Sequence, residues 1–378
     1  MPSSVNMSYW ELKEYFTNVD LIIIGSGIVG LNTAIYFKKN NPKAKVLVLE
    51  RGILPSGAST KNAGFACFGS PSELLSDLEK MDENTVWETV KMRWDGLKLL
   101  RKNLGDKNIG FKQYGGYELF KDKKSFQSCL DATNYLNKKA KEYIGRKNVF
   151  SDRSSSVRSF GFKNINGIIL NNEEGQIDTS EMFNSLLNLA CSYGIKILNN
   201  IEVTVMKDHK TSVELHCNAG IFKTKKVVVA VNGFARDLLK IKDVSPARAQ
   251  VLITKPIKNL KLKGTFHYDE GFYYFRNIDG RVLFGGGRNL DLKGETTTQI
   301  ATTAKIQNAL EGLLKNVILP GQKFEIEHRW AGIMGVGTEK KPIIKHYTPN
   351  IVCAVRMGGM GVAIGSLVGK KAAKLIAD

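Results

Sequence analysis

The sequence lacks the features that would make this chain a metal-bound, disulfide-stabilised or membrane-spanning protein. Its five cysteines are scattered and form no C-x-x-C pair, so we expect no zinc site and no disulfide framework, and we predict a reducing, cytoplasmic location. No apolar run is long enough to span a bilayer, so we expect no transmembrane segment. The first residues lack the basic start and apolar core of a secretory signal.

Acidic residues are scarce relative to basic ones, with 36 Asp and Glu against 55 Lys and Arg, which gives a net charge of +19. Such an excess suits a polyanion such as tRNA or an anionic membrane surface. The excess is mostly lysine in short runs, for example residues 121–124 and 223–226, which we interpret as solvated surface. We therefore expect no nucleic-acid partner, and peripheral membrane contact stays open.

What is present is an ordinary globular composition with one informative stretch, residues 20–51. An apolar run, Leu21–Ile24, breaks into Gly25-Ser26-Gly27-Ile28-Val29-Gly30, which matches G-x-G-x-x-G. A helical pattern follows over about 28–39, then a second apolar run over 46–49 that ends in Glu50. This order predicts a strand, a glycine-rich turn, a helix and a second strand.

Each part of this stretch has a physical role in binding a dinucleotide. The glycines allow a tight turn, close approach to a diphosphate and close packing of the helix, whose N-terminus favours an anion. Glu50 stands where a carboxylate accepts hydrogen bonds from ribose hydroxyls. The stretch does not distinguish FAD from NAD, and the alternative is a turn whose glycines serve packing alone.

Three later segments have the same character. Residues 57–64 (GASTKNAG) are small and polar, a buried strand over 227–231 ends in Asn232-Gly233, and the glycine-rich segment 357–361 opens onto the last helix. Small residues of this kind let a backbone lie close against a flat ligand.

With these segments in this order, the chain resembles the D-amino-acid oxidase (DAO) family of FAD-dependent oxidoreductases, which includes glycine oxidase-, sarcosine oxidase- and gamma-glutamylputrescine oxidase-like enzymes. The resemblance covers nearly the whole chain. It implies an α/β and α+β fold, with a Rossmann-like FAD-binding domain of discontinuous segments and a second, antiparallel-sheet substrate domain. We assign residues 1–83, 151–245 and 325–378 to the first domain, and 84–150 and 246–324 to the second.

The resemblance also implies a set of residues around the FAD. The three glycines of the motif would hold the pyrophosphate, Glu50 and Arg51 the adenosine ribose, Val203 the adenine, and residues 358–362 the pyrimidine end of the flavin. The full predicted set is Gly25, Gly27, Ile28, Val29, Gly30, Glu50, Arg51, Ser59, Thr60, Asn62, Ala63, Gly64, Val203, Ala230, Gly233, Gly332, Gly358, Gly359, Met360, Gly361 and Val362.

Two departures from the family pattern matter. In glycine oxidase-like members an arginine follows the segment matching Ala331-Gly332-Ile333 and binds the substrate carboxylate, but here Met334 follows it, which puts a simple α-amino acid substrate in doubt. Members with covalent flavin use a cysteine in the segment matching 333–338, and none occurs there. The resemblance therefore implies non-covalent FAD.

Tyr273, Arg276 and Arg356 are the predicted pocket residues for catalysis, and Arg276, Arg329 or Arg356 would replace the missing carboxylate anchor. The alternatives are Tyr273 in the core, Arg276 in a surface ion pair and Arg356 as a flavin contact only.

The implied reaction is FAD-dependent oxidation of a CH–NH bond in an amine or amino-acid-like substrate, by hydride transfer to flavin N5 and hydrolysis of the imine. Three alternatives stay open: a 2-hydroxy-acid or quinone-linked flavin dehydrogenase, a tRNA-modifying FAD oxidoreductase, and a protein that holds FAD without turnover. The sequence leaves the electron acceptor, O₂ or quinone, undecided.

Overall fold

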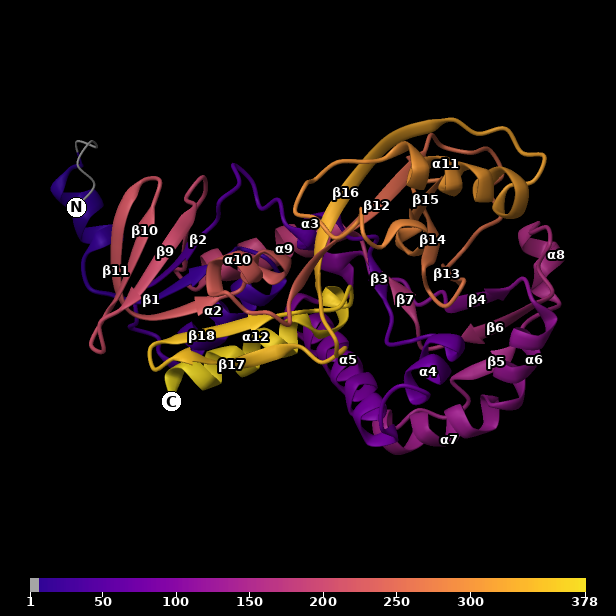
Figure 1. Ribbon diagram of the computed structural model, residues 1–378, viewed down its shortest axis with the longest axis horizontal. Helices are drawn as coiled ribbons and strands as arrows, with labels where there is room; N and C mark the ends of the chain where they lie inside the picture. The colour runs from indigo at the N-terminus through magenta and orange to yellow at the C-terminus, as the bar shows by residue number, and fades with distance from the viewer. Residues whose placement is uncertain (1–6) are drawn as a thin grey trace.

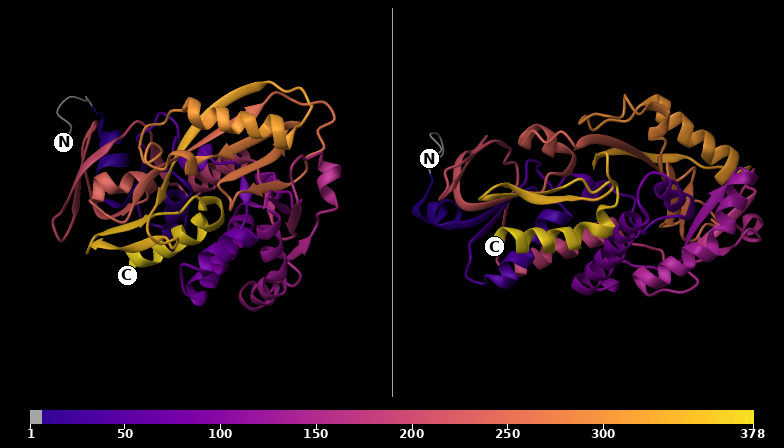
Figure 2. Two further views of the ribbon diagram at one scale, coloured as in Figure 1. Left: turned by 45° about the vertical axis from the view of Figure 1, so that its right-hand side comes forward. Right: turned by 60° about the horizontal axis from the view of Figure 1, so that its bottom comes forward.

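A computed structural model describes residues 7–378 and contains two large β-sheets joined through long, curved strands (Figure 1). The first six residues, which the domain prediction includes, lie outside the described part. The first sheet and its helices occupy the left of Figure 1 and the second sheet the right, and the turned views in Figure 2 keep this separation. Within residues 7–378, no helix is both long and apolar enough to cross a membrane.

The first sheet has a parallel centre with β1 in the middle. Because both faces of β1 are covered, its residues are apolar in near-continuous order: Leu21 and Ile23 pack on one side and Ile22 and Ile24 on the other. The path runs through β17 (Ile343–Thr348), β18 (Ile351–Val355), β11 (Gly220–Val229), β1 (Val19–Ile24), β2 (Val46–Leu49) and β8 (Lys196–Leu198), with β9 (Val203–Asp208) and β10 (Val213–Cys217) paired alongside.

The second sheet is mostly antiparallel, and β13 and β4 form its parallel pair. Its order is β16 (Ile326–Val336), β12 (Ser245–Thr254), β15 (Arg281–Gly286), β14 (Tyr273–Ile278), β13 (Thr265–Tyr268), β4 (Gly116–Phe120), β6 (Gly167–Asn171) and β5 (Phe150–Asp152). A small pair, β3 (Phe65–Ala66) and β7 (Gly175–Gln176), completes the β-structure.

Helices cover both sheets. They include α2 (Ile28–Asn40), α3 (Ala58–Lys61), α4 (Pro71–Leu78), α5 (Glu83–Leu104), α9 (Thr179–Ser192) and α12 (Gly361–Ala377). The others include α6 (Lys123–Asp131), α7 (Thr133–Ile144), α8 (Ser156–Phe160), α10 (Ala235–Leu239) and α11 (Ala304–Leu313).

The hydrogen-bonded sheets divide the chain differently from the predicted segments. Strands β5 and β6 fall in the predicted segment 151–245 or at its border, yet they extend the second sheet beside β4. Strand β16 falls in the predicted segment 325–378, yet it pairs with β12 along most of its length. The local sequence does not reveal these pairings, because each joins residues far apart in the chain.

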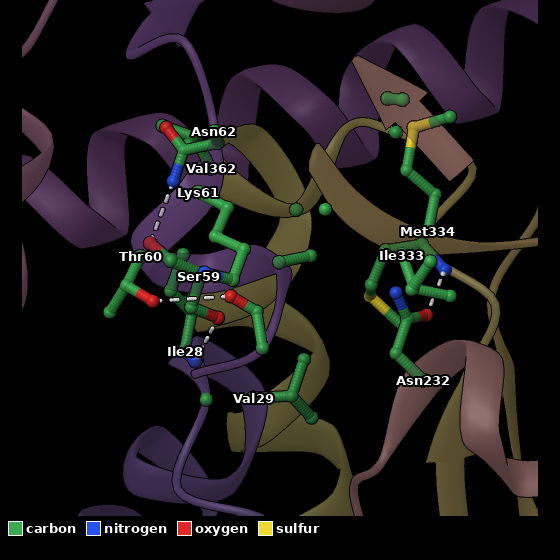
Figure 3. Close-up of a pocket in the computed structure, with 18 of the residues that line it drawn as sticks. Ile28, Val29, Ser59, Thr60, Lys61, Asn62, Asn232, Ile333, Met334 and Val362 are labelled. Carbon is green, nitrogen blue, oxygen red and sulfur yellow. Dashed lines mark hydrogen bonds between the residues drawn. The ribbon is translucent and has the colours of Figure 1, made fainter. Parts of the chain in front are cut away.

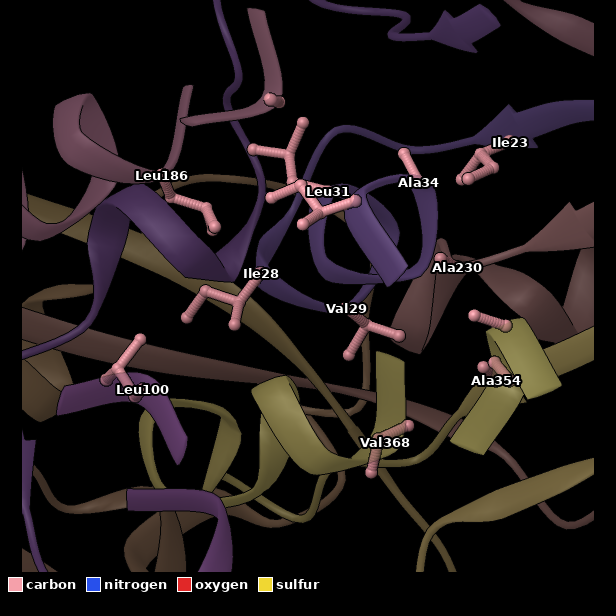
Figure 4. Packing of buried hydrophobic residues seen from close by; sticks show 14 of the residues in the cluster. Ile23, Ile28, Val29, Leu31, Ala34, Leu100, Leu186, Ala230, Ala354 and Val368 are labelled. Carbon is pink, nitrogen blue, oxygen red and sulfur yellow. The ribbon is translucent and has the colours of Figure 1, made fainter. Parts of the chain in front are cut away.

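Helix α12 packs very closely on α2, and two glycines one turn apart make this possible. A β-carbon on Gly365 would lie 2.6 Å from Cγ2 of Ile28, and one on Gly369 would lie 2.7 Å from the carbonyl oxygen of Val29. The same layer is filled by side chains such as Leu100 and Leu186 (Figure 4). Because neither position has a side chain, the two helices pack in direct contact and their N-terminal turns lie close together.

A buried polar network ties the second sheet to the segment before β7. Glu174 is completely buried, and its Oε1 accepts a hydrogen bond from Thr265 Oγ1 at 2.7 Å and lies 2.6 Å from Nε2 of His267. Burial by itself lowers the pKa of His267, but the charge and hydrogen bond of Glu174, with help from Glu118 and Glu73, outweigh it and leave that pKa raised.

The glycine contact yields a prediction on stability. Gly369→Ala should lower the free energy of unfolding by about 1–3 kcal/mol because of overpacking, although alanine is the better helix former. The matched change Gly312→Ala, in α11 where a β-carbon meets nothing within 4 Å, should leave the protein as stable or more stable. Urea unfolding measures both, and a Gly369→Ala protein as stable as Gly312→Ala would contradict the packing argument.

The His267 network yields a prediction on pH. Because the folded pKa is raised, the charged network stabilises the fold fully below the unfolded pKa of about 6.5, and this contribution is lost as pH rises through the folded value. Each unit of raised pKa is worth about 1.4 kcal/mol. The difference in melting temperature between wild type and His267→Asn should therefore shrink from about pH 6 to about pH 9.

Melting curves across this pH range measure that difference. His209→Asn, at an exposed turn, is the control and should follow the wild type at every pH. Parallel pH profiles for wild type and His267→Asn would show that the raised pKa contributes nothing to stability.

Candidate functional site

One cavity of about 870 Å³ lies where the carboxyl ends of β1, β2 and β11 meet the inner face of the second sheet. Figure 3 shows Ser59, Thr60 and Ile28 on one side of this cavity and Met334 and Asn232 on the other. In open α/β sheets a ligand binds beyond the carboxyl ends of the strands, where the strand order reverses, and the position between β1 and β11 is such a point.

The glycine-rich turn after β1 delivers helix α2 directly to the cavity. Gly25 has a φ of +102°, which a residue with a side chain rarely adopts, and a β-carbon on Gly30 would lie 1.9 Å from the carbonyl oxygen of Gly25. Gly25 and Gly27 line the cavity, whereas Gly30 lies beneath it and allows the helix to pack on the turn.

Glu50 holds this turn in place from the end of β2. Its Oε2 accepts hydrogen bonds from the backbone N–H of Ser26 at 3.1 Å and from the Ser26 hydroxyl at 2.7 Å. Its Oε1 accepts one from the backbone N–H of Gly52 at 3.0 Å. Beside it, the guanidinium of Arg51 stacks on the ring of Phe234 at 3.7 Å from the centroid. Glu50 therefore both shapes the turn and lines the cavity.

Three helices begin at the cavity. Within the described residues, the N-cap residue of each helix makes no side-chain hydrogen bond to the first turn. Residues from the first turns of α2, α3 and α12 line the wall, for example Ile28, Ser59 and Val362. The Ser59 hydroxyl accepts a hydrogen bond from the N–H of Ile28 at 2.9 Å, which links α3 to α2 (Figure 3). The N-termini of the two longer helices, α2 and α12, give this region a positive potential suited to a diphosphate or another anionic edge.

The loop after α3 and the loop before α12 are held by asparagines. Asn62 donates from Nδ2 to the carbonyl of Ser59 at 2.7 Å and accepts at Oδ1 from the N–H of Gly64 at 2.8 Å. Asn232 accepts at Oδ1 from the N–H of Met357 at 3.1 Å. These bonds fix backbone segments that line the cavity, so its shape is built before any ligand arrives.

The structure brings together nearly all of the predicted cofactor residues. Only Gly30 and Gly233 are not among the lining residues, and Gly233 instead lies against the backbone of β16, where a β-carbon would be 2.3 Å from the carbonyl oxygen of Met334. The predicted residues that line the cavity are Gly25, Gly27, Ile28, Val29, Glu50, Arg51, Ser59, Thr60, Asn62, Ala63, Gly64, Val203, Ala230, Gly332, Gly358, Gly359, Met360, Gly361 and Val362.

The predicted catalytic residues are not among the residues that line the cavity, and Tyr273 shows why. The strand alternation of β14 turns its side chain away from the cavity and into the core of the second sheet, where it packs near Tyr268 and Phe284. Its neighbour Tyr274 faces the cavity instead. The prediction of Tyr273 as a pocket residue therefore chose the wrong one of two neighbouring residues on β14.

Arg276 lies behind the cavity wall, with 2% of its surface exposed. Its guanidinium packs directly against Gly64, in the space that a side chain at position 64 would otherwise occupy. Burial lowers its pKa to about 10, against the charges of Asp178 and Asp279. It is therefore neither a lining residue nor part of a surface ion pair.

Arg356 and Arg329 are engaged elsewhere. Arg356 is buried and forms ion pairs with Asp243 and Glu339, and Arg329 pairs with Glu311. Because each guanidinium already has a carboxylate partner and neither lines the cavity, the prediction that they replace the missing anchor at Met334 is wrong.

Aromatic rings from two sheets form one wall of the cavity: His267 on β13 and Tyr274 on β14 of the second sheet, and Phe65 on the short strand β3. Phe65 packs edge-on against His267 and Tyr274, with ring centroids 5.3 and 5.7 Å apart, and all three residues line the cavity. His267 is directly opposite Tyr274 in the ladder between β13 and β14. Burial raises the pKa of Tyr274 to about 12, so its hydroxyl stays protonated. Strand alternation could have selected Tyr274 over Tyr273, but the pairing with His267 requires the fold.

Charged side chains close the same end of the cavity. Burial by itself would raise the pKa of Glu73, but Arg93 and Lys340 lower it to about 2, so Glu73 is ionised. Nζ of Lys340 lies 3.0 Å from Glu73 and 2.7 Å from Asp77. These ion pairs link α4 to the loop after β16, so α4 is fixed beside the cavity.

One group in the described part of the chain has metal-ligand side chains close together: Cys67, Glu174 and His267, whose ligating atoms lie within 4.8 Å of one another. Glu174 Oε1 already bridges His267 and Thr265. Burial raises the pKa of Cys67, and the charge of Glu174 adds to this, so Cys67 remains a thiol and is a poor ligand. Hydrogen bonding therefore accounts for this cluster.

The residues present fit a dinucleotide with a flat ring system. The close approach at Gly25 and Gly30 leaves room for a diphosphate against α2, and Glu50 stands beside it at the end of β2. The glycines of segment 357–361 expose backbone at the start of α12, where a negative ring edge is favoured.

Comparisons with known proteins agree with this geometry. The family model of FAD-dependent oxidoreductases (DAO) matches residues 20–375. The chain is 23% identical over 346 residues to sarcosine oxidase subunit beta of Rhizobium meliloti, covering 89% of this chain and 78% of that protein. It is 23% identical over 403 residues to D-amino acid dehydrogenase of Helicobacter pylori, covering 95% of each.

The fold is similar to solved structures. Glycine oxidase from Bacillus cereus superposes with a TM-score of 0.76 at 18% identity, over 95% of each chain. Since the family model spans almost the whole chain, the protein belongs to the DAO family of FAD-dependent oxidoreductases, and FAD is its cofactor.

Proposed function

We propose that this enzyme oxidises a CH–NH bond of an amine or amino-acid-like substrate held between the FAD and the aromatic wall formed by Phe65, His267 and Tyr274. The observation that carries the proposal is one continuous cavity, which joins the helix N-termini at one end to Phe65, His267 and Tyr274 at the other. When bound, FAD supplies a hydride acceptor at N5, and the imine product is hydrolysed. The relatives that act on sarcosine and on D-amino acids support the same bond type.

The residues of the chain position the FAD and exclude water from the end of the cavity where the reaction takes place. Gly25, Gly27 and the N-terminus of α2 would hold the diphosphate, Glu50 and Arg51 would lie at the adenosine ribose, and Val203 at the adenine. The N-terminus of α12, with residues 358–362, would lie at the pyrimidine end of the flavin and favour negative charge there. The aromatic wall excludes water from the reacting end.

The flavin is expected to be held without a covalent bond. Segment 333–338 has no cysteine, and Cys67, the cysteine that lines the cavity, is kept in its unreactive thiol form by burial. The free state of all five cysteines supports a reducing compartment, and the cytoplasm stays our prediction for the location.

A division into two functional parts goes with this proposal. The first sheet with α2 and α12 would form the FAD-binding part, and the second sheet the substrate part, with β5, β6 and β16 assigned to the latter by their hydrogen bonds.

Anaerobic mixing tests the function directly. The FAD-loaded protein, mixed without oxygen with a panel of secondary amines, primary amines and amino acids, should lose its visible flavin absorbance with at least one of them. The matching 2-hydroxy acids form the control panel and should leave the spectrum unchanged. If a 2-hydroxy acid bleached the flavin and no amine did, the proposed reaction would be wrong, and the enzyme would oxidise the alcohol carbon of a hydroxy acid instead.

Met334 yields a second test, because it stands on β16 where a carboxylate anchor is expected and lines the cavity. Met334→Arg should raise the rate of anaerobic bleaching by glycine or a D-amino acid by about tenfold or more, since a guanidinium binds a carboxylate in two-point geometry. Met334→Leu is the size-matched control and should give no such gain. Rapid bleaching of the wild type by glycine would show that the methionine excludes nothing.

A further inference from the structure

The cavity contains one arginine at its substrate end, Arg288, and this residue has no acidic partner. The lining residues include two arginines, and the other, Arg51, stacks on Phe234 beside Glu50 at the opposite end. Arg288 begins the short helix η4 (Arg288–Asp291), which directly follows β15 of the second sheet. Among residues 7–378, no carboxylate lies within ion-pair distance of its guanidinium.

The acidic group expected to neutralise Arg288 is already occupied. Glu295 lies near enough to influence it, but both carboxylate oxygens of Glu295 bind Arg248, at 2.9 and 2.8 Å, and Oε1 also accepts from Gln250 at 3.0 Å. Glu270 lines the same end of the cavity and forms no ion pair with Arg288. The guanidinium therefore faces the cavity with its hydrogen-bond donors available.

The backbone holds Arg288 in a fixed place. The N–H of Gly287 donates to the carbonyl of Phe272 at 2.9 Å, and the N–H of Leu290 donates to the carbonyl of Gly287 at 3.1 Å. The side chain of Asn289 donates to Asp269 at 3.2 Å, which ties the helix to the turn at 269–272. A residue on such an anchored turn can select the position of a ligand group.

A half-buried, unpaired guanidinium is costly, and an anion in the cavity would remove the cost. Burial lowers the pKa of Arg288, and the charge of Glu295 opposes this only in part, but an arginine keeps its charge at all working pH values. A carboxylate would regain two charge-assisted hydrogen bonds. Phe272 and Tyr274, which also line this end, offer apolar contact to the body of the same molecule.

We propose that Arg288 binds the carboxylate of the substrate, the role for which the chain has no arginine at Met334. The substrate is then an amino acid or another amine that carries a carboxylate, with its acid group at the end of β15 rather than at β16. This inference rests on the proposed function for the identity of the substrate, but carboxylate binding itself can be measured without turnover.

The test uses the FAD-loaded protein and two probes of the same shape, benzoate and its uncharged amide, benzamide. Dissociation constants come from the change in flavin absorbance and from calorimetry. Wild type should bind benzoate about tenfold or more tightly than benzamide, and Arg288→Gln should lose this preference by weakening benzoate alone. Arg288→Lys, which keeps the charge without the two-point geometry, should fall between them.

Arg329→Gln is the matched control, because Arg329 pairs with Glu311 and does not line the cavity. It should bind benzoate like the wild type. Unchanged benzoate affinity in Arg288→Gln and Arg288→Lys, or a wild type that does not distinguish the two probes, would overturn the proposal.

Dependence on pH separates Arg288 from His267, a lining side chain whose charge changes near neutral pH. His267 faces the carboxylate of Glu174, with Glu118 and Glu73 nearby, and Lys340, which lines the same end, is paired with Glu73 and Asp77. Benzoate affinity should stay constant from about pH 6 to about pH 9, since a guanidinium does not titrate there. Affinity that falls as pH rises, and that is lost in His267→Asn, would assign the anchor to His267 instead.

Anaerobic bleaching by phenylalanine and by phenethylamine, which lacks the carboxylate, separates failure of this inference from failure of the function. Equal bleaching by both, unaffected by Arg288→Gln, would overturn the anchor and leave amine oxidation standing. Benzoate binding that depends on Arg288, in a protein that no amine bleaches, would support the anchor and remove the proposed reaction.

Discussion

The carbonyl oxygen of Gly25 and the α-carbon of Gly30 lie so close that no side chain fits between them, and the rest of the site depends on this contact. A β-carbon at Gly30 would lie 1.9 Å from that oxygen. Because the helix can pack this tightly, α2 starts at the carboxyl end of β1 and presents its first N–H groups to the cavity. Glu50 then secures the turn through Ser26 and Gly52.

The same kind of contact places the second helix. Gly365 and Gly369 bring α12 against α2, so that the N-termini of these helices open on one cavity although they begin more than 300 residues apart in the chain. The potential of this region is therefore a product of helix packing and of the backbone, and it does not require the +19 net charge.

Local patterns predicted a dinucleotide at the end of β1, and the family resemblance narrowed it to FAD. The glycine-rich turn and Glu50 indicated a dinucleotide within a few residues, and the family resemblance implied the wider set of residues, nearly all of which line one cavity. The substrate end could not be predicted in this way. Whether Tyr273 or Tyr274 faces inward is set by the register of β14 between β13 and β15, and those partners are fixed by pairings across the second sheet.

Charged residues show the same limit. Arg276 and Arg356 had the right chemistry for an anchor, but the fold buries the first behind Gly64 and pairs the second with Asp243 and Glu339. Arg288 gave no signal in the sequence, because its lack of a partner follows from the use of Glu295 by Arg248. In the same way the placement of β5, β6 and β16 in the second sheet depends on long-range strand pairing, which composition does not reveal.

We propose that this cavity holds one FAD per chain without a covalent bond. Absorbance of the purified, FAD-incubated protein after removal of free cofactor, followed by acid precipitation and chromatography of the supernatant, measures this directly. The account predicts a flavin spectrum in the folded protein and intact FAD, close to one equivalent per chain, in the supernatant. A protein that retains no flavin, or a flavin that stays with the precipitated chain, would contradict it.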